Sequence, residues 1–288
     1  MPRLFERVTI AGVGLIGGSL ALAARAAGLI GEVVGLGRSA ANLDIAQRRG
    51  IIDRYSHDPA EAARDADLLL LAVPVRSIAA VARACAPALR PRAVVSDVGS
   101  VKQTILRDVE AALPAGVTFV GAHPIAGTEE SGAAAADADL FRGRRCIVTP
   151  GAHADAAAVG KIRALWEGVG MQVDEMDAAR HDQVLAWVSH LPHALAFSAV
   201  NAVCDVDAAV QPFAGPSFGD LTRVAASSAD MWCDIFLANA VQVDHAVARF
   251  VATLEALRGA IAAGDEATLR ALLERARAAR REWSARPA

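Results

Sequence analysis

The sequence has little of what marks secreted, metal-binding or nucleic-acid-binding proteins. Its 288 residues include only four cysteines, which lie far apart and show no CxxC spacing. We therefore expect reduced, mostly buried thiols in a cytoplasmic protein rather than a disulfide framework or a zinc finger. The formal net charge of −3 gives no reason to expect nucleic acid as a partner. No uninterrupted apolar run approaches the roughly eighteen residues of a membrane span, so no membrane partner is expected.

No internal repeat and no low-complexity linker divides the chain, so its organisation has to be found from hydrophobic periodicity. Short β-branched or apolar runs, typical of strands, occur at 7–11, 32–36, 66–73, 93–96, 117–120, 146–149 and 171–176. The run ADLLLLAV at 66–73 is continuously apolar, as in a parallel strand that is buried on both faces. Because helical segments separate several of these runs, the pattern predicts an α/β fold with a Rossmann-type doubly wound, mostly parallel sheet.

Strand signals largely stop after residue 176. Beyond it the pattern predicts long helical stretches at 181–204, 219–226, 229–262 and 265–283. We therefore place a domain boundary near 177, with an α/β domain over 1–177 and an all-helical domain over 178–288.

A glycine-rich turn joins the first predicted strand to the first predicted helix. Gly12, Gly14 and Gly17 have the G-x-G-x-x-G spacing, in the strand–turn–helix context that binds a dinucleotide. The glycines permit a tight turn, close approach of pyrophosphate and helix–strand contact, while the helix N-terminus offers unpaired N–H groups. The alternative is a glycine turn with no ligand. We interpret 1–177 as a dinucleotide-binding domain and expect its cofactor contacts to include Gly12, Gly14, Leu15, Ile16, Gly17, Val73 and Pro74.

The end of the second predicted strand bears on the choice of cofactor. NAD-selective sites usually carry Asp or Glu there, which binds the ribose 2′-hydroxyl. Here the residues are Gly35-Leu36-Gly37-Arg38-Ser39, without a carboxylate. Arg38 and Ser39 suit a 2′-phosphate, which favours NADP. The alternative is that Arg38 stacks on adenine, which leaves NAD acceptable.

Three predicted loops leave the carboxyl ends of strands, where doubly wound sheets bind ligands. They read VPV at 73–75, SDVGSVK at 96–102 and HPIAGTEESG at 123–132. Ser100 and His123 are the polar groups expected near a bound nicotinamide. A neutral histidine beside a hydroxyl that is becoming a carbonyl is the usual arrangement for hydride removal, because the imidazole takes the developing proton. The alternative is that His123 is a structural histidine.

Five stretches in both predicted domains resemble the prephenate/arogenate (cyclohexadienyl) dehydrogenase family of tyrosine biosynthesis. They occur in the order found in that family and span nearly the whole chain: GVGLIGGSL, SDVGSVK, GAHPIAGTEESG, HDQVLAWVSHLPHALAF and FAGPSFGDLTRVAASSADMWCDIFLAN. The resemblance implies NAD(P)-dependent oxidation of prephenate with loss of CO2, giving 4-hydroxyphenylpyruvate. It also implies a homodimer in which 178–288 binds substrate and forms the dimer.

The same resemblance implies roles for individual residues. His123 accepts the hydrogen bond of the substrate hydroxyl, and Ser100 bonds the same hydroxyl and helps to hold His123. Arg223 and His193 bind substrate carboxylates, Glu129 shapes the pocket and Trp232 lines it. Each of these four substrate-binding roles has a structural alternative. Arg223 could be a helix-surface arginine, Glu129 a solvated loop acid, His193 a structural residue and Trp232 a core residue.

Two further points limit the resemblance. Gly215-Pro216-Ser217-Phe218 replaces the glycine-rich GGGF that relatives commonly have, and Gly219 replaces a frequent basic residue, so the preferred substrate side chain is open. Relatives restricted to arogenate often lack the second histidine of SHLPH, so the resemblance implies through His193 a preference for prephenate, with acceptance of arogenate as the alternative. His190 and His193 stand three residues apart but no third ligand is placed by spacing, so no metal is expected.

A related hydroxy-acid or imine reductase, an amino-substituted prephenate dehydrogenase and a non-catalytic NADP sensor remain as alternative functions.

Overall fold

The structure is a computed structural model that describes residues 3–128, 130–206 and 208–285. The chain forms two compact units, Met1–Ala240 and Val241–Ala288. Among the described helices, none combines the length and the apolarity that a membrane crossing requires.

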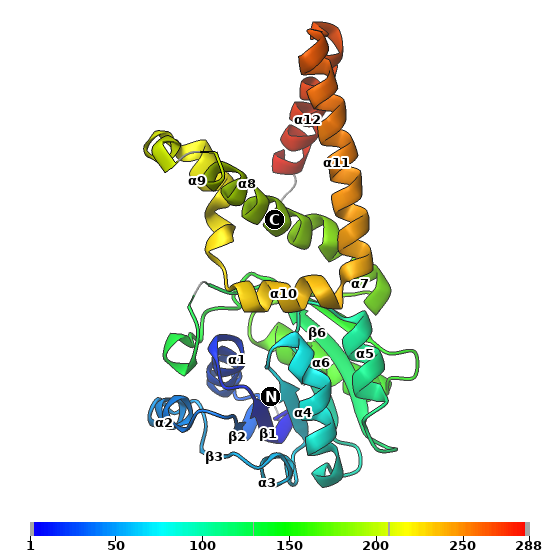
Figure 1. The fold of residues 1–288 in the computed structure, drawn as a ribbon. Coiled ribbons are helices and arrows are strands. Elements are labelled where there is room, and N and C mark those ends of the chain that lie inside the picture. The colour runs from blue at the N-terminus through cyan, green and yellow to red at the C-terminus, as the bar shows by residue number, and fades with distance from the viewer. Residues whose placement is uncertain (1–2, 129, 207, 286–288) are drawn as a thin grey trace. The chain divides into compact units, whose positions relative to one another are not determined.

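An eight-stranded sheet runs through the first unit (Figure 1). Its spatial order is β3-β2-β1-β4-β5-β6-β7-β8, and β6 and β7 are the one antiparallel pair among the described strands. The strands are β1 (Phe5–Ala11), β2 (Ile30–Leu36), β3 (Arg54–Ser56), β4 (Leu68–Leu71), β5 (Val94–Asp97), β6 (Thr118–Pro124), β7 (Arg145–Pro150) and β8 (Gln172–Glu175). The predicted doubly wound, mostly parallel sheet is confirmed. The short strand β3 was not predicted, because its three residues show no apolar run.

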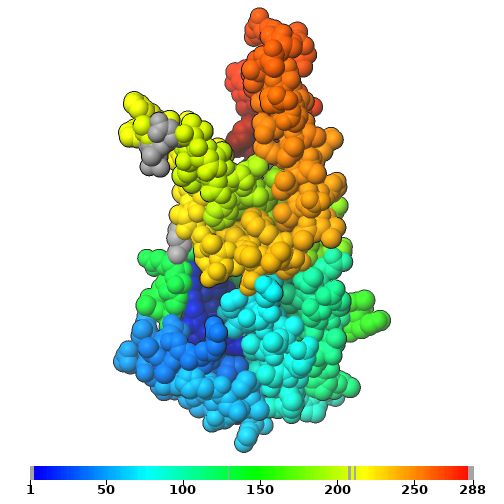
Figure 2. All heavy atoms as spheres, viewed as in Figure 1, coloured from blue at the N-terminus to red at the C-terminus, as the bar shows by residue number. Residues whose placement is uncertain are grey.

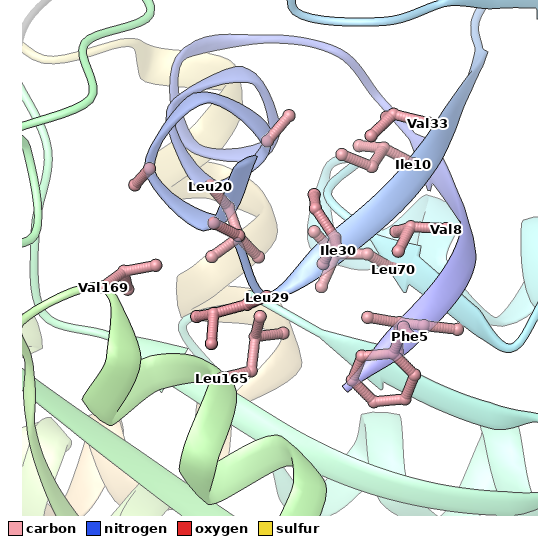
Figure 3. Packing of buried hydrophobic residues seen from close by; sticks show 14 of the residues in the cluster. Phe5, Val8, Ile10, Leu20, Leu29, Ile30, Val33, Leu70, Leu165 and Val169 are labelled. Carbon is pink, nitrogen blue, oxygen red and sulfur yellow. The ribbon is translucent and has the colours of Figure 1, made fainter. Parts of the chain in front are cut away.

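Helices cover both faces of this sheet. Buried side chains of α1 (Leu15–Ala26), α2 (Ala40–Arg48) and α6 (Ala156–Gly168) form one hydrophobic cluster with the strands. Figure 3 shows part of this cluster, in which Leu20 and Leu165 lie near strand residues such as Ile30. A second cluster lies under α3 (Pro59–Ala63), α4 (Ile78–Cys85) and α5 (Gln103–Glu110). Leu68, Leu69, Leu70 and Leu71 of β4 are divided between the two clusters, as expected for a strand buried on both faces.

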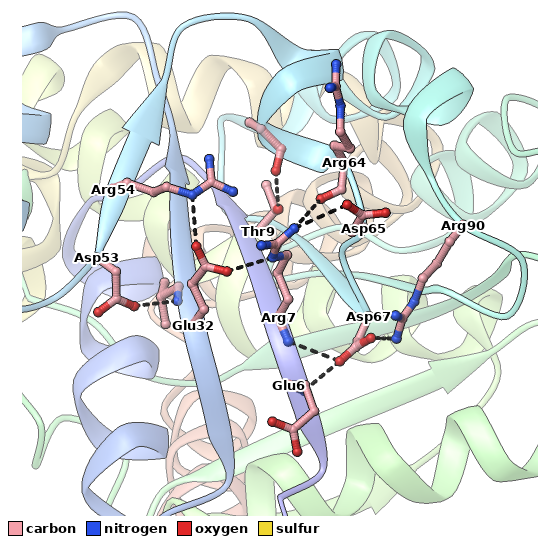
Figure 4. Close-up of polar contacts among 12 residues, drawn as sticks. Glu6, Arg7, Thr9, Glu32, Asp53, Arg54, Arg64, Asp65, Asp67 and Arg90 are labelled. Carbon is pink, nitrogen blue, oxygen red and sulfur yellow. Dashed lines mark hydrogen bonds and ion pairs between the residues drawn. The ribbon is translucent and has the colours of Figure 1, made fainter.

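Charged residues near the amino ends of the strands pair with one another. Glu32 accepts hydrogen bonds from Arg7 Nε at 2.7 Å and Arg54 Nε at 2.8 Å. Asp67 accepts from the backbone N–H of Arg7 at 3.0 Å and forms an ion pair with Arg90 (Figure 4). These carboxylates are therefore engaged in structural contacts at the amino ends of the strands, whereas the glycine turn lies at their carboxyl ends.

Helices follow the sheet to the end of the described chain. In the first unit they are α7 (Ala178–Leu185), the π-helical turn η4 (Ala186–His190), α8 (Leu191–Cys204), α9 (Pro216–Thr222) and α10 (Ala229–Ala238), and then come α11 (Ala240–Ala263) and α12 (Glu266–Ala285). The helix predicted at 181–204 is interrupted by η4. The helix predicted at 229–262 is broken at Asn239, whose side chain donates to the Asp182 carbonyl at 2.9 Å. The boundary predicted near 177 falls two residues after β8 and stays a prediction.

Candidate active site

A cavity of about 900 Å³ lies at the carboxyl ends of β1, β2 and β4. Six of the predicted cofactor residues line it: Gly12, Gly14, Arg38, Ser39, Val73 and Pro74. The other three, Leu15, Ile16 and Gly17, are not among the described residues that do. In Figure 2 the dark-blue amino-terminal segment lies recessed between the lighter blue and cyan segments that supply other walls of this cavity.

The glycine turn fits a dinucleotide phosphate. Gly12 has φ of +91°, and a Cβ there would lie 2.2 Å from the carbonyl oxygen of Ala72. A Cβ at Gly17 would lie 2.5 Å from the Gly12 carbonyl oxygen, so that glycine permits close contact between α1 and the turn. Gly14 has no neighbour within 4 Å of the equivalent position and borders the cavity. The backbone at the start of α1 is therefore open to an anionic group, which a helix N-terminus attracts.

The part of the cavity that follows β2 has a basic and polar lining. Arg38 and Ser39 follow β2 there, His57 follows β3, and no carboxylate is among the described residues that line the cavity. Ser39 caps α2, accepting from the Asn42 N–H at 3.3 Å. His57 Nδ1 lies 2.6 Å from the Gly37 carbonyl oxygen, which can only accept, so this nitrogen carries the hydrogen.

His123 lies near the carboxyl end of β6 and is buried. Its Nδ1 atom is 2.8 Å from Nε2 of His181 on α7. The pKa of His123 is held well below its ordinary value of 6.5, mainly by burial and further by His181, Lys102 and His190. His123 is therefore a neutral imidazole at neutral pH, and a neutral imidazole can accept a proton.

A buried ion pair ties the loop after β5 to the strand that carries His123. Lys102 Nζ donates to the Asp97 carboxylate and, at 2.8 Å, to the carbonyl of Ala122. Asp97 also accepts from the N–H groups of Gly99 at 2.8 Å and Ala122 at 3.2 Å. Burial lowers the pKa of Lys102, and attraction to Asp97 opposes this effect. The hydrogen bonds to both partners satisfy charges that would otherwise be costly to bury.

The Asp182 carboxylate lies at the start of α5. It accepts hydrogen bonds from the backbone N–H groups of Lys102 at 2.7 Å and Gln103 at 2.9 Å, and its Oδ1 lies 2.8 Å from Nδ1 of His181. Lys102, the N-cap residue of α5, makes no capping hydrogen bond with its own side chain. Asp182 thus supplies, from α7, the acceptor that a helix start requires.

A second group of predicted residues gathers around Trp232 on α10. His193, on α8, stacks on the Trp232 ring, and its Nδ1 donates to the Ser189 carbonyl at 2.9 Å. The pKa of His193 is lowered mainly by burial, with a further contribution from the positive charge of Arg223. Trp232 also belongs to a hydrophobic cluster that Val75 joins. Since Val75 follows Val73 and Pro74 along one loop, this loop connects the wall of the cavity to the Trp232 group.

Two predicted residues are not joined to these groups by side-chain hydrogen bonds. The Ser100 hydroxyl makes no hydrogen bond to His123 within the described structure, although its backbone raises the pKa of the nearby His190. Burial outweighs that effect and lowers the pKa of His190 to about 4. Glu129 lies outside the described residues. The role predicted for each stays a prediction.

Sequence reasoning assigned no role to several polar residues of this site. They are His57, Asp97, Lys102, His181, Asp182 and Asn239. Asp97, Lys102, His181 and Asp182 lie in the stretches SDVGSVK and HDQVLAWVSHLPHALAF, which was the one available signal. His57 follows a strand too short to be predicted, and Asn239 lies within what periodicity predicted to be a continuous helix.

Together these residues place a buried neutral imidazole, a dinucleotide-sized cavity and a stacked histidine–tryptophan pair in one unit. The sequence matches known families over two adjacent segments. Residues 20–175 match the family described as prephenate dehydrogenase, nucleotide-binding domain, and residues 177–275 match prephenate dehydrogenase, dimerization domain.

Individual proteins show the same similarity. The chain is 39% identical over 266 residues to the cyclohexadienyl dehydrogenase of Zymomonas mobilis, covering 91% of this chain and 90% of that protein. It is 34% identical over 243 residues to the prephenate dehydrogenase of Bacillus subtilis, covering 83% of this chain and 66% of that protein. The structure resembles the crystal structure of prephenate dehydrogenase from A. aeolicus in complex with hydroxyphenyl propionate and NAD+. The TM-score is 0.89 at 35% identity, over 96% of this chain and 98% of that one.

Proposed function

This chain belongs to the prephenate dehydrogenase family of NAD(P)-dependent enzymes, and we propose that it oxidises prephenate with loss of CO2. The product would be 4-hydroxyphenylpyruvate, the precursor of tyrosine. The observation that carries the proposal is the buried, neutral His123 at the end of β6, in the same unit as a cavity shaped for a dinucleotide.

In this proposal His123 acts as the base for the substrate hydroxyl. A bound nicotinamide dinucleotide would supply the hydride acceptor. His123 accepts the hydrogen bond, and transiently the proton, of the hydroxyl as the carbinol carbon loses hydride. Since the product is a phenol, the proton returns to the same oxygen, and no net proton has to leave the site. Ser100 is proposed to bond the same hydroxyl.

The remaining predicted residues are proposed to hold the dicarboxylate. Arg223 offers a planar fork of donors that matches a carboxylate. His193 lies close enough to Arg223 for its pKa to respond to it, which supports a shared substrate end for the two. Trp232 would form the aromatic wall beneath His193, and Glu129 would contribute from the loop after β6.

NADP is proposed as the preferred cofactor. Support comes from the lining of the cavity after β2, where Arg38 and Ser39 stand and no carboxylate is found among the described residues. A 2′-phosphate would gain an arginine there, whereas a 2′-hydroxyl would lack its usual acidic partner.

Two proposals concern the organisation of the chain. We propose that the boundary near 177 separates a dinucleotide-binding domain, 1–177, from a helical substrate-binding domain, 178–288, through which the protein forms a homodimer. The two family matches meet between residues 175 and 177, and the second is described as a dimerization domain. A cytoplasmic location is also proposed, supported by four unpaired thiols. Cys85 and Cys146 are buried, but Cys204 and Cys233 are exposed, so the expectation of mostly buried thiols was wrong for half of them.

Steady-state kinetics with prephenate and arogenate, each paired with NAD and NADP, test the function and both specificities. We expect CO2 release and reduced cofactor with prephenate, at the highest kcat/KM when NADP is present. His123→Asn should retain substrate binding but lose at least about 10²-fold in kcat. His153→Asn, the same change at an exposed histidine, is the matched control. Wild-type turnover by His123→Asn, or no turnover of either cyclohexadienol by the native protein, would reject the proposal.

A further inference from the structure

Three buried side chains form a continuous line of polar contacts that ends at His123. Asp182 Oδ1 is 2.8 Å from His181 Nδ1, and His181 Nε2 is 2.8 Å from His123 Nδ1. All three side chains are buried, with 8% or less of each residue exposed. The three come from two elements, α7 and β6, so the line exists only in the folded protein.

The first step along this line is the contact between Asp182 and His181. Asp182 already receives two backbone N–H groups at the start of α5, and backbone N–H groups can only donate. The positive end of the α5 dipole also favours the ionised carboxylate there. An ionised carboxylate only accepts, so the hydrogen between the two side chains belongs to Nδ1 of His181.

The second step fixes the hydrogen of His123. A neutral imidazole carries one N–H, and which nitrogen bears it is set by the hydrogen bond that the other nitrogen makes. Burial lowers the pKa of His181 despite the opposing effect of Asp182, so the ring is neutral. With its hydrogen on Nδ1, His181 presents a bare Nε2. The hydrogen of the contact to His123 therefore lies on Nδ1 of His123, and the Nε2 atom of His123 is left bare.

The surroundings of His123 also disfavour a charged imidazole. Burial, then His181, then Lys102, which is held by Asp97, and then His190 all lower the pKa of His123. A second, permanent proton in this cluster is therefore unfavourable, while Asp182 is the carboxylate that would compensate a transient one. The proposed reaction returns its proton to the substrate oxygen, so the line has no need to carry a proton to solvent.

We propose that Asp182 and His181 are positioning residues, which hold His123 as the tautomer with Nε2 bare and so aim its lone pair at the substrate hydroxyl. The inference rests on the proposed function for its catalytic consequence only. The tautomer itself is a property of the free protein. In serine proteases, changing the aspartate that sets a histidine tautomer to asparagine lowers kcat about 10⁴-fold, which shows how much such a device can contribute.

The first test is nitrogen-15 NMR of the histidine side chains in the free wild-type protein, with His123 assigned by its loss in His123→Asn. We expect a protonated-type signal for Nδ1 and a bare-type signal for Nε2 in both His123 and His181. Hydrogen on Nε2 of His123 would overturn the inference. This readout is independent of turnover, so it stands apart from a failure of the proposed function.

The second test compares two substitutions of one residue, both of which leave Asp182 at the start of α5. His181→Phe removes the acceptor for His123, and we expect kcat to fall at least about 10²-fold while the KM values for prephenate and NADP stay within about 3-fold. His181→Gln offers a carbonyl to His123 and an amide to Asp182, and should recover at least about a tenth of the native kcat. Equal kcat values for Phe, Gln and native His would overturn the inference.

The third test changes the carboxylate. Asp182→Asn can donate to Nδ1 of His181 and so reverse both tautomers, which predicts a fall in kcat as large as that of His181→Phe and a protonated-type Nε2 signal for His123. Asp177→Asn is the matched control, because Asp177 caps the same helix and asparagine caps equally well. An unchanged tautomer in folded Asp182→Asn would contradict the proposed role of Asp182.

Discussion

The imidazole of His193 lies nearly flat on the indole of Trp232, with 3.6 Å between the ring centroids and 23° between the ring planes. The Trp232 Nε1 atom is buried and has no hydrogen-bond partner among the described residues. Because His193 uses Nδ1 to bond the Ser189 carbonyl, its Nε2 is the nitrogen left for a ligand. Stacking on the apolar indole of Trp232 thus fixes the direction in which His193 Nε2 points.

Substitutions of Trp232 should show how much its aromatic surface contributes to prephenate binding. Trp232→Phe keeps a ring beneath His193, so we expect the KM for prephenate to change less than about 3-fold. Trp232→Ala removes the stack and should raise that KM by about 10-fold, in line with the energy of an aromatic pair. Steady-state kinetics measure both, with Trp283→Ala, at a residue 64% exposed, as control. Equal KM values for Trp232→Ala and the control would contradict the placement of Trp232 at the substrate.

The glycine turn offers a comparison between two neighbouring glycines. Gly12→Ala forces a side chain into φ of +91° and against the Ala72 carbonyl, so we expect poor folding and a lower Tm. Gly14→Ala meets no protein atom within 4 Å and should fold normally, yet it should bind NADP at least about 10-fold more weakly. Thermal denaturation and cofactor titration distinguish the two effects. Normal NADP affinity in Gly14→Ala would place the cofactor elsewhere.

Arg38 should decide between the two cofactors. Arg38→Ala removes the cation offered to a 2′-phosphate, so we expect the KM for NADP to rise about 10-fold or more, with little change in the KM for NAD. Arg48→Ala, at an exposed position of α2, is the matched control. An equal rise in both KM values would instead support stacking of Arg38 on adenine.

Substitutions in the Asp97–Lys102 pair should change both the unfolding free energy and the pH dependence of kcat. Lys102→Met leaves Asp97 buried without its counter-charge and should cost about 3–5 kcal/mol of unfolding free energy, whereas the double variant Asp97→Asn/Lys102→Met should cost less. Because the Lys102 charge lowers the pKa of His123, its loss should move the acidic limb of kcat to higher pH. Urea denaturation of both variants and a pH–kcat profile of Lys102→Met measure these effects. An unmoved acidic limb would remove Lys102 from the electrostatics of His123.

Buried histidines should make the fold sensitive to mild acid. An unfolded histidine titrates near 6.5, but burial lowers the pKa of His190 to about 4 in the folded protein. Protonation therefore favours the unfolded chain, so His190 costs no stability above pH 6.5 and destabilises the fold as the pH falls from 6.5 toward 4. We expect His190 alone to remove about 2 kcal/mol of unfolding free energy between pH 7.5 and 5. The lowered pKa values of His123 and His181 act in the same direction.

Urea titrations at the two pH values measure this loss. His190→Gln should show a smaller pH dependence than the native protein by about one bound proton, and His153→Gln, at an exposed position, should show none of this reduction. A native pH slope in His190→Gln would show that His190 does not titrate on unfolding.

Local patterns were enough to predict the sheet and the glycine turn. The run at 66–73 is apolar because both faces of β4 are buried, and the glycines near residue 12 are spaced by the turn they form. The contacts of His123 could not be predicted in this way, because His181 lies 58 residues along the chain. Similarly, η4 and the break at Asn239 interrupt helices whose hydrophobic period continues through them. They depend on tertiary contacts, such as the bond of Asn239 to Asp182, which override the local preference.

Asp182 gives the start of α5 its hydrogen-bond acceptor and, through His181, sets the hydrogen on His123. During heating, these contacts should therefore be lost before the sheet unfolds. Partial opening of α7 would release both contacts while the hydrophobic clusters around the sheet stay intact, since local opening requires less free energy than global unfolding. Activity would then disappear at a lower temperature than the circular dichroism signal of the helices and strands, and it would return on cooling.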